Sequence, residues 1–398
     1  MQQHSNLDIS QNKALLWLMA IACGLCAGTN YYCQPLISSI QSDFQIPESQ
    51  VALTVTFAQV AYALGLLFIV PIGDIVNKTK FIPLLMMFAA VGLFISAFSN
   101  NIYLLWTGTI VASLFSVAAQ VLIPFATMAV KAEKTGQVIG FLMSGLLVGI
   151  LLSTSIAGVL SELWHWKMIY LLSGSLMLVL AVLLKSHLPY LLRLNLSYFD
   201  IFRSMGSLLQ QEPRLVLRSL IGGCCFAAMS ILFSTIALLL TQKPFYLSDI
   251  WVGLITLVGV FGALSSSYLG RFADRGCTQL LTLFGLITLA SSWALLYGGA
   301  VSLLSYILGY ALINLGLAMV HTANQGIVFR LRPDAKSRIN SIYMTTYFIG
   351  GACGSALGVF SWQHGGWYMS CLAGLVLVGC AALFALLDQH YIKSRHSA

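Results

Sequence analysis

The chain has 398 residues, of which 59% are hydrophobic and only 8% are charged. A soluble domain carries about 25% charged residues, whereas the uncharged stretches here repeatedly exceed about 20 residues, the length that crosses a bilayer. The composition therefore argues against a soluble enzyme and predicts an integral membrane protein. Its formal net charge of +8 then reports orientation in the membrane and does not imply nucleic-acid binding.

The apolar stretches predict twelve membrane-spanning helices, six in each half of the chain. Backbone amides in lipid must be satisfied within the segment, so spans of this length are expected to be helices. The expected spans lie near residues 14–40, 50–72, 81–98, 102–130, 137–160, 164–184, 215–241, 250–270, 278–298, 301–329, 339–360 and 366–387. The predicted fold class is an all-α integral membrane protein whose twelve transmembrane helices form two six-helix pseudo-repeats.

The two halves match each other at an offset of about 200 residues. Asp74 falls near Asp274 in a similar loop, and Gly149 corresponds to Gly350. A repeat this long in a hydrophobic chain is typical of a two-halved transporter, because solenoid repeats have periods of about 20 to 50 residues.

Three regions follow from this repeat. Residues 1–184 are expected to form an N-terminal six-helix bundle and residues 215–398 a C-terminal one. Residues 185–214 form a cytoplasmic linker in which hydrophobic side chains recur at helical spacing, so we expect an amphipathic helix on the membrane surface. An ordinary solvated linker is the alternative.

The distribution of Lys and Arg predicts the orientation. With both termini in the cytoplasm, only Lys167 and Lys243 among the basic residues lie outside, as the positive-inside rule requires. The N-terminus lacks a cleavable signal pattern. We therefore expect a multi-pass protein of a bacterial cytoplasmic (inner) membrane with both termini inside.

A charged loop follows the second helix of each half. The second copy keeps Gly270, Asp274 and Arg275 of the pattern Gly-x-Leu-Ala-Asp-Arg-x-Gly-Arg-Arg, and the first copy keeps Asp74 and Lys78. Together with six plus six helices and a central linker, these loops resemble those of the major facilitator superfamily, over essentially the whole chain. The resemblance implies a membrane transporter that works by alternating access.

Two further segments resemble a bacterial branch of drug and metabolite exporters. They are residues 30–36, with the sequence Asn-Tyr-Tyr-Cys-Gln-Pro-Leu, and residues 333–338, with the sequence Pro-Asp-Ala-Lys-Ser-Arg. This likeness implies multidrug or metabolite efflux by a proton-coupled antiporter. Two features depart from such exporters: nothing basic lies between Trp106 and Lys131, and Ile150 follows Gly149 where they carry Pro.

The loop residues are interpreted as a gating latch. A carboxylate at a helix end can pair with cations or with the positive N-terminus of a helix in the opposite half, a contact available in one access state only. The latch residues are Asp74, Lys78, Gly270, Asp274 and Arg275. Two solvated loop carboxylates that only help topology are the alternative.

Polar side chains within the spans predict a substrate cavity. Polar groups facing lipid are costly, so these groups should face the protein interior. The candidate substrate-binding residues are Asn30, Tyr31, Gln34, Gln120, His321, Asn324, Gln325, Tyr343 and Tyr347. Gln120 and His321 stand at the repeat offset and would face each other. For each single residue, hydrogen bonding between helices is the competing interpretation.

No Asp or Glu falls in the middle of an expected span, and His321 is the one deeply embedded titratable group besides tyrosines and cysteines. Histidine changes charge near physiological pH, so His321 is the candidate for proton coupling. A neutral imidazole that lines the cavity is the alternative.

Small residues at four-residue spacing predict close helix packing. These residues are Gly145, Gly149, Gly350, Gly354 and Gly358. No phosphate-binding loop, zinc motif or nucleophile elbow occurs, so no catalysis, metal or cofactor is expected.

The sequence thus predicts a monomeric secondary active transporter of a small organic solute. Its expected partners are the substrate, protons and the lipid bilayer, and no nucleic acid. Proton-coupled efflux is the leading hypothesis. An uptake symporter or a facilitated-diffusion carrier is the alternative, followed by a non-transporting membrane receptor.

Overall fold

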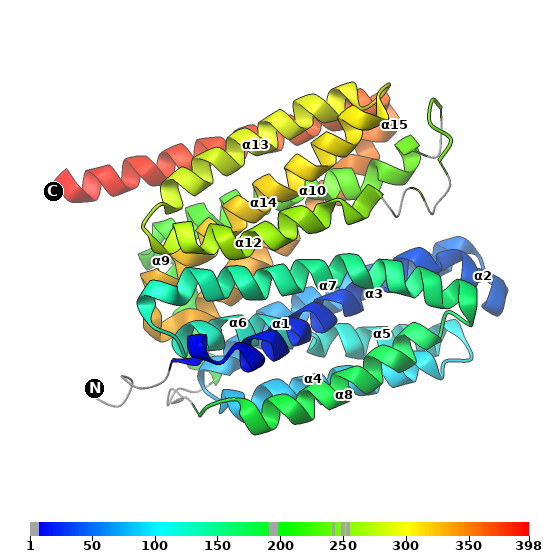
Figure 1. Ribbon diagram of the computed structural model, residues 1–398, viewed down its shortest axis with the longest axis horizontal. Helices are drawn as coiled ribbons and strands as arrows, with labels where there is room; N and C mark the ends of the chain where they lie inside the picture. The colour runs from blue at the N-terminus through cyan, green and yellow to red at the C-terminus, as the bar shows by residue number, and fades with distance from the viewer. Residues whose placement is uncertain (1–7, 191–197, 241–242, 248–250, 252–254, 398) are drawn as a thin grey trace. The chain divides into compact units, whose positions relative to one another are not determined.

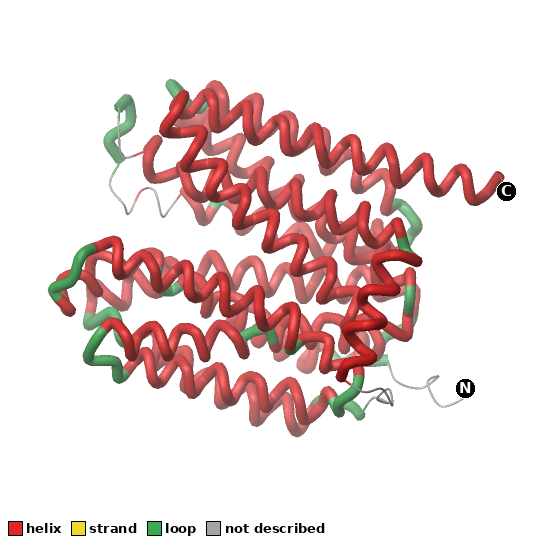
Figure 2. Tube along the Cα trace, turned by 180° about the vertical axis from the view of Figure 1, so that it is seen from behind, coloured by secondary structure: helices red, strands yellow, loops and turns green. Residues whose placement is uncertain are grey.

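The computed structural model describes residues 8–190, 198–240, 243–247, 251 and 255–397 (Figure 1). Over these residues the chain consists of helices and loops, with no strand (Figure 2). The expected all-helical class is confirmed for this part of the chain.

Thirteen short and long helical segments precede the central linker. They are η1 (Ile9–Gln11), α1 (Lys13–Gly28), η2 (Thr29–Tyr31), η3 (Gln34–Leu36), α2 (Ile37–Phe44), α3 (Glu48–Phe68), η4 (Val70–Asp74), α4 (Lys78–Ala97), α5 (Ile102–Phe115), α6 (Ala118–Met128), η5 (Ala132–Lys134), α7 (Thr135–Leu163) and α8 (Met168–His187). Several begin at an Asn whose side chain accepts an amide hydrogen of the first turn, as Asn12, Asn77 and Asn101 do.

The second half begins with α9 (Tyr198–Gln211), whose side chains Ile201, Met205 and Leu208 are buried. The later elements are α10 (Pro213–Leu240), α12 (Gly259–Asp274), α13 (Thr278–Gly298), α14 (Leu303–Leu331), η6 (Pro333–Ala335) and α15 (Lys336–Ser397). Residues 191–197 of the expected linker and residues 248–250 and 252–254 around the expected eighth span lie outside the described residues.

Ten stretches of the described chain are long and apolar enough to cross a membrane. The last of them covers 60 residues, from Pro333 to Ile392, and contains both of the final expected spans. Gly366 interrupts α15 with a φ of 62°, a backbone conformation that a residue with a Cβ rarely adopts. The count of twelve spans remains a prediction.

The first expected span, residues 14–40, is not one continuous α-helix. The α-helical part ends at Gly28, and two 3₁₀ turns connect it to α2. Pro35 lies in the second turn; proline cannot donate the backbone hydrogen bond that a continuing α-helix would need. The side chains of residues 29–36 are therefore presented at angles that a regular helix would not give.

The contacts divide the chain into two compact units, described separately below. The N-terminal unit comprises residues 1–134, 141–201 and 335–341, and the C-terminal unit comprises residues 135–140, 202–334 and 342–398. Each unit thus includes the first turns of a helix whose remainder belongs to the other. The predicted boundaries at 184 and 215 remain predictions.

Glycines allow close helix contact in both units. A Cβ on Gly149 would collide with Gly24 of α1, and a Cβ on Gly350 would collide with Gly223 of α10. Gly145 similarly meets Ala20, Gly354 meets Ala227, and Gly358 meets Ile231 and Ser234. Small residues let helix backbones approach closely in a membrane, where van der Waals contact drives packing.

Long helices run side by side within each unit (Figure 1). In the N-terminal unit α4 lies against α5 and α8, and in the C-terminal unit α14 lies against α12 and α13. The C-terminal core contains the fully buried rings of Trp293, Tyr306 and Tyr310. These packed helices form the frame that holds the polar groups described next.

Candidate functional site

Asp74 ends the first charged loop and is only 3% exposed. Its carboxylate oxygens accept the backbone N–H groups of Ser337 and Arg338, each at 3.3 Å, in the first turn of α15. The Arg338 Nε donates to Asp74 Oδ2 at 3.0 Å, and Lys78 Nζ lies 3.7 Å from Oδ1. A carboxylate at this place is stabilised both by two cations and by the positive end of a helix.

Asp274 ends the second charged loop and makes the corresponding contact with α7. Its Oδ1 accepts the backbone N–H of Gly136 at 2.6 Å, and its Oδ2 accepts that of Gln137 at 2.8 Å. Arg330 Nη2 lies 3.2 Å from Oδ1. The closely spaced backbones of Gly270 and Gly136 leave no room for a Cβ on either residue.

The partner of Asp274 was not the expected one. Arg275, named with the latch, lies over the ring of Phe272, with its guanidinium carbon 6.0 Å from the ring centre. Arg330, from the end of α14, takes the place beside the carboxylate. The sequence interpretation did not include Arg330 in the latch.

The two carboxylate sites are equivalent in the repeat. Asp74 and Asp274 are 200 residues apart, and the amides that they accept, at positions 136 and 137 and at 337 and 338, are 201 apart. Each carboxylate therefore binds the N-terminus of a helix that continues into the other unit. The two loops thus make the same kind of contact with a helix N-terminus.

His321 lies in the C-terminal unit and is 7% exposed. Its Nδ1 lies 3.0 Å from the Tyr343 hydroxyl, and its ring centre lies 4.8 Å from that of Tyr347. Tyr347 in turn stacks on Phe226, with ring centres 4.2 Å apart and planes inclined by 13°. Three of the predicted substrate residues, His321, Tyr343 and Tyr347, are thus brought together.

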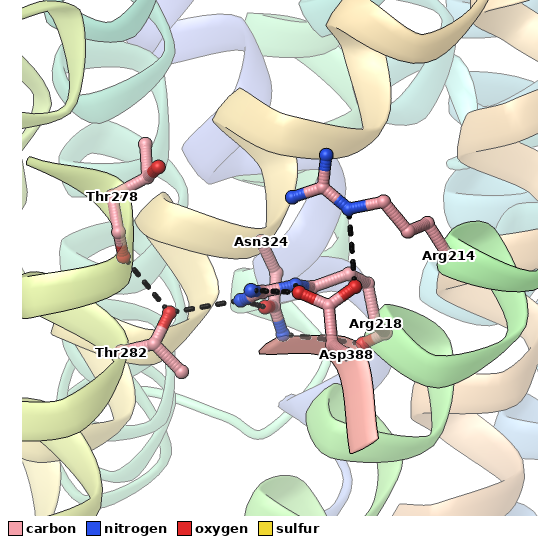
Figure 3. Close-up of polar contacts among 6 residues, drawn as sticks. All are labelled: Arg214, Arg218, Thr278, Thr282, Asn324 and Asp388. Carbon is pink, nitrogen blue, oxygen red and sulfur yellow. Dashed lines mark hydrogen bonds and ion pairs between the residues drawn. The ribbon is translucent and has the colours of Figure 1, made fainter. Parts of the chain in front are cut away.

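A buried ion pair lies in the same unit (Figure 3). Asp388 Oδ2 accepts from Arg218 Nε at 3.1 Å and from Arg218 Nη2, and Asp388 Oδ1 accepts from Arg214 Nε at 3.1 Å. Asp388 is fully buried and Arg218 is 1% exposed. The side chain of Arg214 is 26% exposed.

This pair corrects two expectations. Asp388 was expected at a helix end, but α15 runs on to Ser397 and encloses it. His321 was expected to be the one embedded titratable group besides tyrosines and cysteines, yet Arg218 and Asp388 are buried as well. The sequence does place an arginine, Arg218, four residues inside the expected seventh span. It does not indicate which carboxylate pairs with that arginine.

Asn324 is hydrogen-bonded to the arginine of this ion pair. Arg218 Nη1 donates to Asn324 Oδ1 at 3.2 Å and to Thr282 Oγ1 at 2.9 Å, and Asn324 Nδ2 donates to the Arg218 carbonyl at 3.2 Å (Figure 3). One polar network therefore joins Asp388, Arg218, Thr282 and Asn324.

Gln120 is buried in the N-terminal unit, where Asn340 Nδ2 donates to its carbonyl oxygen at 2.8 Å and to its Oε1 at 3.3 Å. The sequence interpretation missed Asn340, which precedes the aromatic residues of α15. Gln325 belongs to the C-terminal unit, and its Nε2 lies 3.8 Å from the Met344 sulfur. Because Gln120 and His321 lie in different units, their expected position opposite each other remains a prediction.

Asn30 lines a small polar cavity of about 10 Å³ in the N-terminal unit, together with Ser96, Thr109 and Ser113. Asn30 Oδ1 and the three hydroxyl oxygens have no hydrogen-bond partner among the described residues. The volume is sufficient for one water-sized group, and such groups need two to four polar partners. The cavity therefore has the space and the polar atoms to bind one water molecule or one polar substituent of a ligand.

The other two residues predicted near Asn30 do not line this cavity. Tyr31 is half-buried and Gln34 is exposed. The 3₁₀ turns that follow α1 explain the position of Gln34, because positions four apart share a face in an α-helix but not in a 3₁₀ helix. No group of three or more potential metal ligands occurs among the described residues.

The chain matches the family model described as the Major Facilitator Superfamily over residues 19–355. A protein of Escherichia coli O157:H7, described as an uncharacterized transporter, YgaY, is 40% identical over 92% of this chain and 93% of its own length. The "Probable sugar efflux transporter" of Pasteurella multocida is 25% identical, covering 89% of this chain and 87% of its own.

Solved structures share the fold. The human organic anion transporter MFSD10 superimposes with a TM-score of 0.78 at 16% identity, covering 95% of this chain and 99% of its own. The transporter FucP in its outward conformation gives a TM-score of 0.73 at 13% identity, covering 94% of this chain and 99% of its own.

Proposed function

The chain belongs to the major facilitator superfamily of transporters, and we propose that it exports a small organic solute from a bacterial cell in exchange for protons. The protein would lie in the inner membrane, with both termini in the cytoplasm. Its twelve helices would form two six-helix repeats that alternate between inward and outward access.

The two-repeat arrangement is supported by equivalent contacts in the two units. Gly24 meets Gly149 in one, and Gly223 meets Gly350 in the other, at offsets of 199 and 201 residues. The two carboxylates also bind equivalent helix N-termini. Two unrelated halves of a chain would not be expected to repeat both kinds of contact at the same sequence spacing.

The carboxylates Asp74 and Asp274 would serve as gating latches. Each holds the first turn of a helix whose remainder belongs to the other unit, so a helix that moved with that other unit would draw its first turn away from the carboxylate. A contact that exists in one access state only shifts the equilibrium between the states. This is the physical requirement for a gate.

A moderately polar, uncharged or weakly charged solute fits the available groups. The N-terminal cavity presents four unpaired oxygens, and the C-terminal unit presents the aromatic cluster of His321, Tyr343 and Tyr347. Hydroxyl and amide groups with aromatic faces bind such molecules. The sugar efflux relative is consistent with a hydroxyl-rich solute and outward transport.

Proton coupling rests on one observation, the surroundings of His321. Its recorded ring-nitrogen partner is the neutral Tyr343 hydroxyl, whereas Asp388 is already committed to two guanidinium groups. Histidine is the side chain whose ordinary pKa lies closest to physiological pH. The imidazole is therefore the better proton carrier of the two.

The test uses full-length protein in proteoliposomes that enclose a pH-sensitive dye. Neutral sugars, sugar acids and small aromatic compounds are added singly, with and without an imposed pH gradient. We expect one class to cause solute-dependent proton movement, and His321→Gln to abolish the proton movement while solute binding persists.

Other outcomes separate the alternatives. Solute movement that ignores the pH gradient would indicate facilitated diffusion, and solute and protons moving in the same direction would indicate a symporter. Binding without any movement would favour a receptor. Each of these results would contradict proton-coupled export.

A further inference from the structure

Four buried side-chain oxygens in the N-terminal unit surround one small cavity. They belong to Asn30 in η2, Ser96 near the end of α4, and Thr109 and Ser113 in α5. Each of the four residues is at most 7% exposed, and none of the four oxygens has a hydrogen-bond partner among the described residues. A buried polar atom without a partner costs free energy, so four of them around one cavity indicate a ligand that binds there.

The orientation of Asn30 follows from its neighbours. Its Nδ2 lies 3.4 Å from the Ala27 carbonyl oxygen and 3.4 Å from Ser116 Oγ. A carbonyl oxygen can only accept a hydrogen, so the atom that faces Ala27 must be the amide nitrogen. The Ser116 hydroxyl already donates to the Ser113 carbonyl at 2.9 Å, so its oxygen receives from Asn30. The unpartnered atom of Asn30 is therefore an acceptor.

The three hydroxyl groups are held in place by helix packing. Thr109 and Ser113 are four residues apart and therefore share one face of α5. Ser96 of α4 lies so close to Gly108 of α5 that a Cβ on this glycine would collide with the Ser96 hydroxyl. A hydroxyl group can donate one hydrogen and can also accept. The cavity thus offers one acceptor on Asn30 and three groups that donate or accept.

The chemistry of the lining selects a neutral O–H group. No Asp, Glu, Lys, Arg or His is among the described residues that line the cavity, so an ion would be buried there without a counter-charge. An apolar group or an ether oxygen would leave Asn30 Oδ1 without a donor. A volume of about 10 Å³ holds one water-sized group, and an O–H group both donates to Asn30 and accepts from the hydroxyls.

We propose that Asn30, Ser96, Thr109 and Ser113 form a binding site for one neutral O–H group, which belongs to a water molecule in the solute-free protein and to a hydroxyl of the solute during transport. The water rests on the cavity alone, whereas the solute hydroxyl also rests on the proposed function. Displacement of an ordered water by a group that cannot reproduce its hydrogen bonds lowers affinity. The site would therefore select a solute with a hydroxyl over the same molecule with hydrogen in its place.

The test variant removes two of the four oxygens from α5. Thr109→Val keeps the shape of the side chain, and Ser113→Ala is combined with it. Thr107→Val is the matched control on the same helix, because Thr107 is exposed and its hydroxyl already donates to the Tyr103 carbonyl at 2.9 Å. If the double variant does not fold, Thr109→Val alone takes its place with the same expected results.

The first measurement is a crystal structure of the full-length protein without solute, at a resolution that shows ordered water and in a buffer that contains sodium and calcium ions. In the wild type and in Thr107→Val we expect one density about 2.8 Å from Asn30 Oδ1 and from at least two of the hydroxyl oxygens. In the double variant we expect that density to be lost. No density in the wild type, equal density in the double variant, or oxygens at about 2.3–2.6 Å, as around Ca²⁺, would overturn the site.

The second measurement separates the two sources of the O–H group. Thermal unfolding of the full-length protein is followed with glucose, galactose and mannose, each beside its monodeoxy derivatives, because a bound solute raises apparent stability. For a sugar that binds, we expect one derivative to bind about tenfold more weakly than its parent to the wild type and to Thr107→Val. In the double variant, parent and derivative should bind equally. Equal binding of a parent and all its derivatives by the wild type would overturn the solute assignment.

This site and the proposed function fail in different ways. A protein that binds none of these sugars would contradict the hydroxyl-rich solute of the proposed function, and the water density would still decide the site. A protein that transports a sugar but shows no density in the cavity would overturn the site and leave the proposed export intact.

Discussion

The two proposed latches make the same kind of contact with a helix N-terminus but have different surroundings. Asp74 is 3% exposed, and its side-chain partners Lys78 and Arg338 are also buried. Asp274 has shorter hydrogen bonds to backbone amides, at 2.6 and 2.8 Å, and its recorded cation, Arg330, is 44% exposed. We therefore expect the first latch to depend mainly on charge and the second mainly on backbone geometry.

The largest difference should appear when each carboxylate is made neutral. Asp74→Asn removes the carboxylate that the buried cations Lys78 and Arg338 both contact, and loss of one partner from a buried pair costs about 3–5 kcal/mol. Thermal or denaturant unfolding of the purified protein measures this cost. In transport assays, the same variant should lower turnover far more than it weakens solute binding.

A compensating variant tests the cause. Lys78→Met added to Asp74→Asn removes one of the two buried cations that contacted the carboxylate and should recover part of the lost stability, giving a coupling energy in a double-mutant cycle. If the two changes are simply additive, or if turnover of Asp74→Asn is normal, charge in the first latch has no gating role.

Asp274→Asn should have a smaller effect. An Asn oxygen can still accept one of the two amide hydrogens, and Arg330 remains partly solvated. The expected loss of stability is about 1–2 kcal/mol, the cost of one buried backbone donor that loses a good acceptor. A loss equal to that of Asp74→Asn would contradict the proposed difference between the latches.

Periodicity and hydropathy predicted the helical fold because spans in lipid must satisfy their own backbone groups. They were less successful where the backbone departs from a regular helix. Pro35 gave the position of the irregular turns after α1 but not their effect on Gln34. The expected break between the last two spans, after residue 360, lies close to the non-helical backbone of Gly365 and Gly366.

The candidate site shows the same limit. The repeat pointed to Asp74 and Asp274, because each lies in a recognisable loop pattern. It could not pair Asp388 with Arg218, which are 170 residues apart, because a charge near the end of a span can equally well face solvent. Asn324 was expected to line a cavity, yet its hydrogen bonds hold it within the network of Arg218.

The smallest expected effect belongs to Arg330→Gln, and it sharpens the comparison most directly. Arg330 is the charged partner of Asp274 but is 44% exposed, and ion pairs at such positions contribute about 0–1 kcal/mol. The two backbone amides of α7 would still hold the carboxylate. We therefore expect a change in unfolding free energy below about 1 kcal/mol and nearly normal turnover. The difference in stability from the wild type should become smaller still at high salt, because salt screens exposed charges. A large, salt-independent loss would mean that the second latch also depends on charge, and the contrast with Asp74 would then disappear.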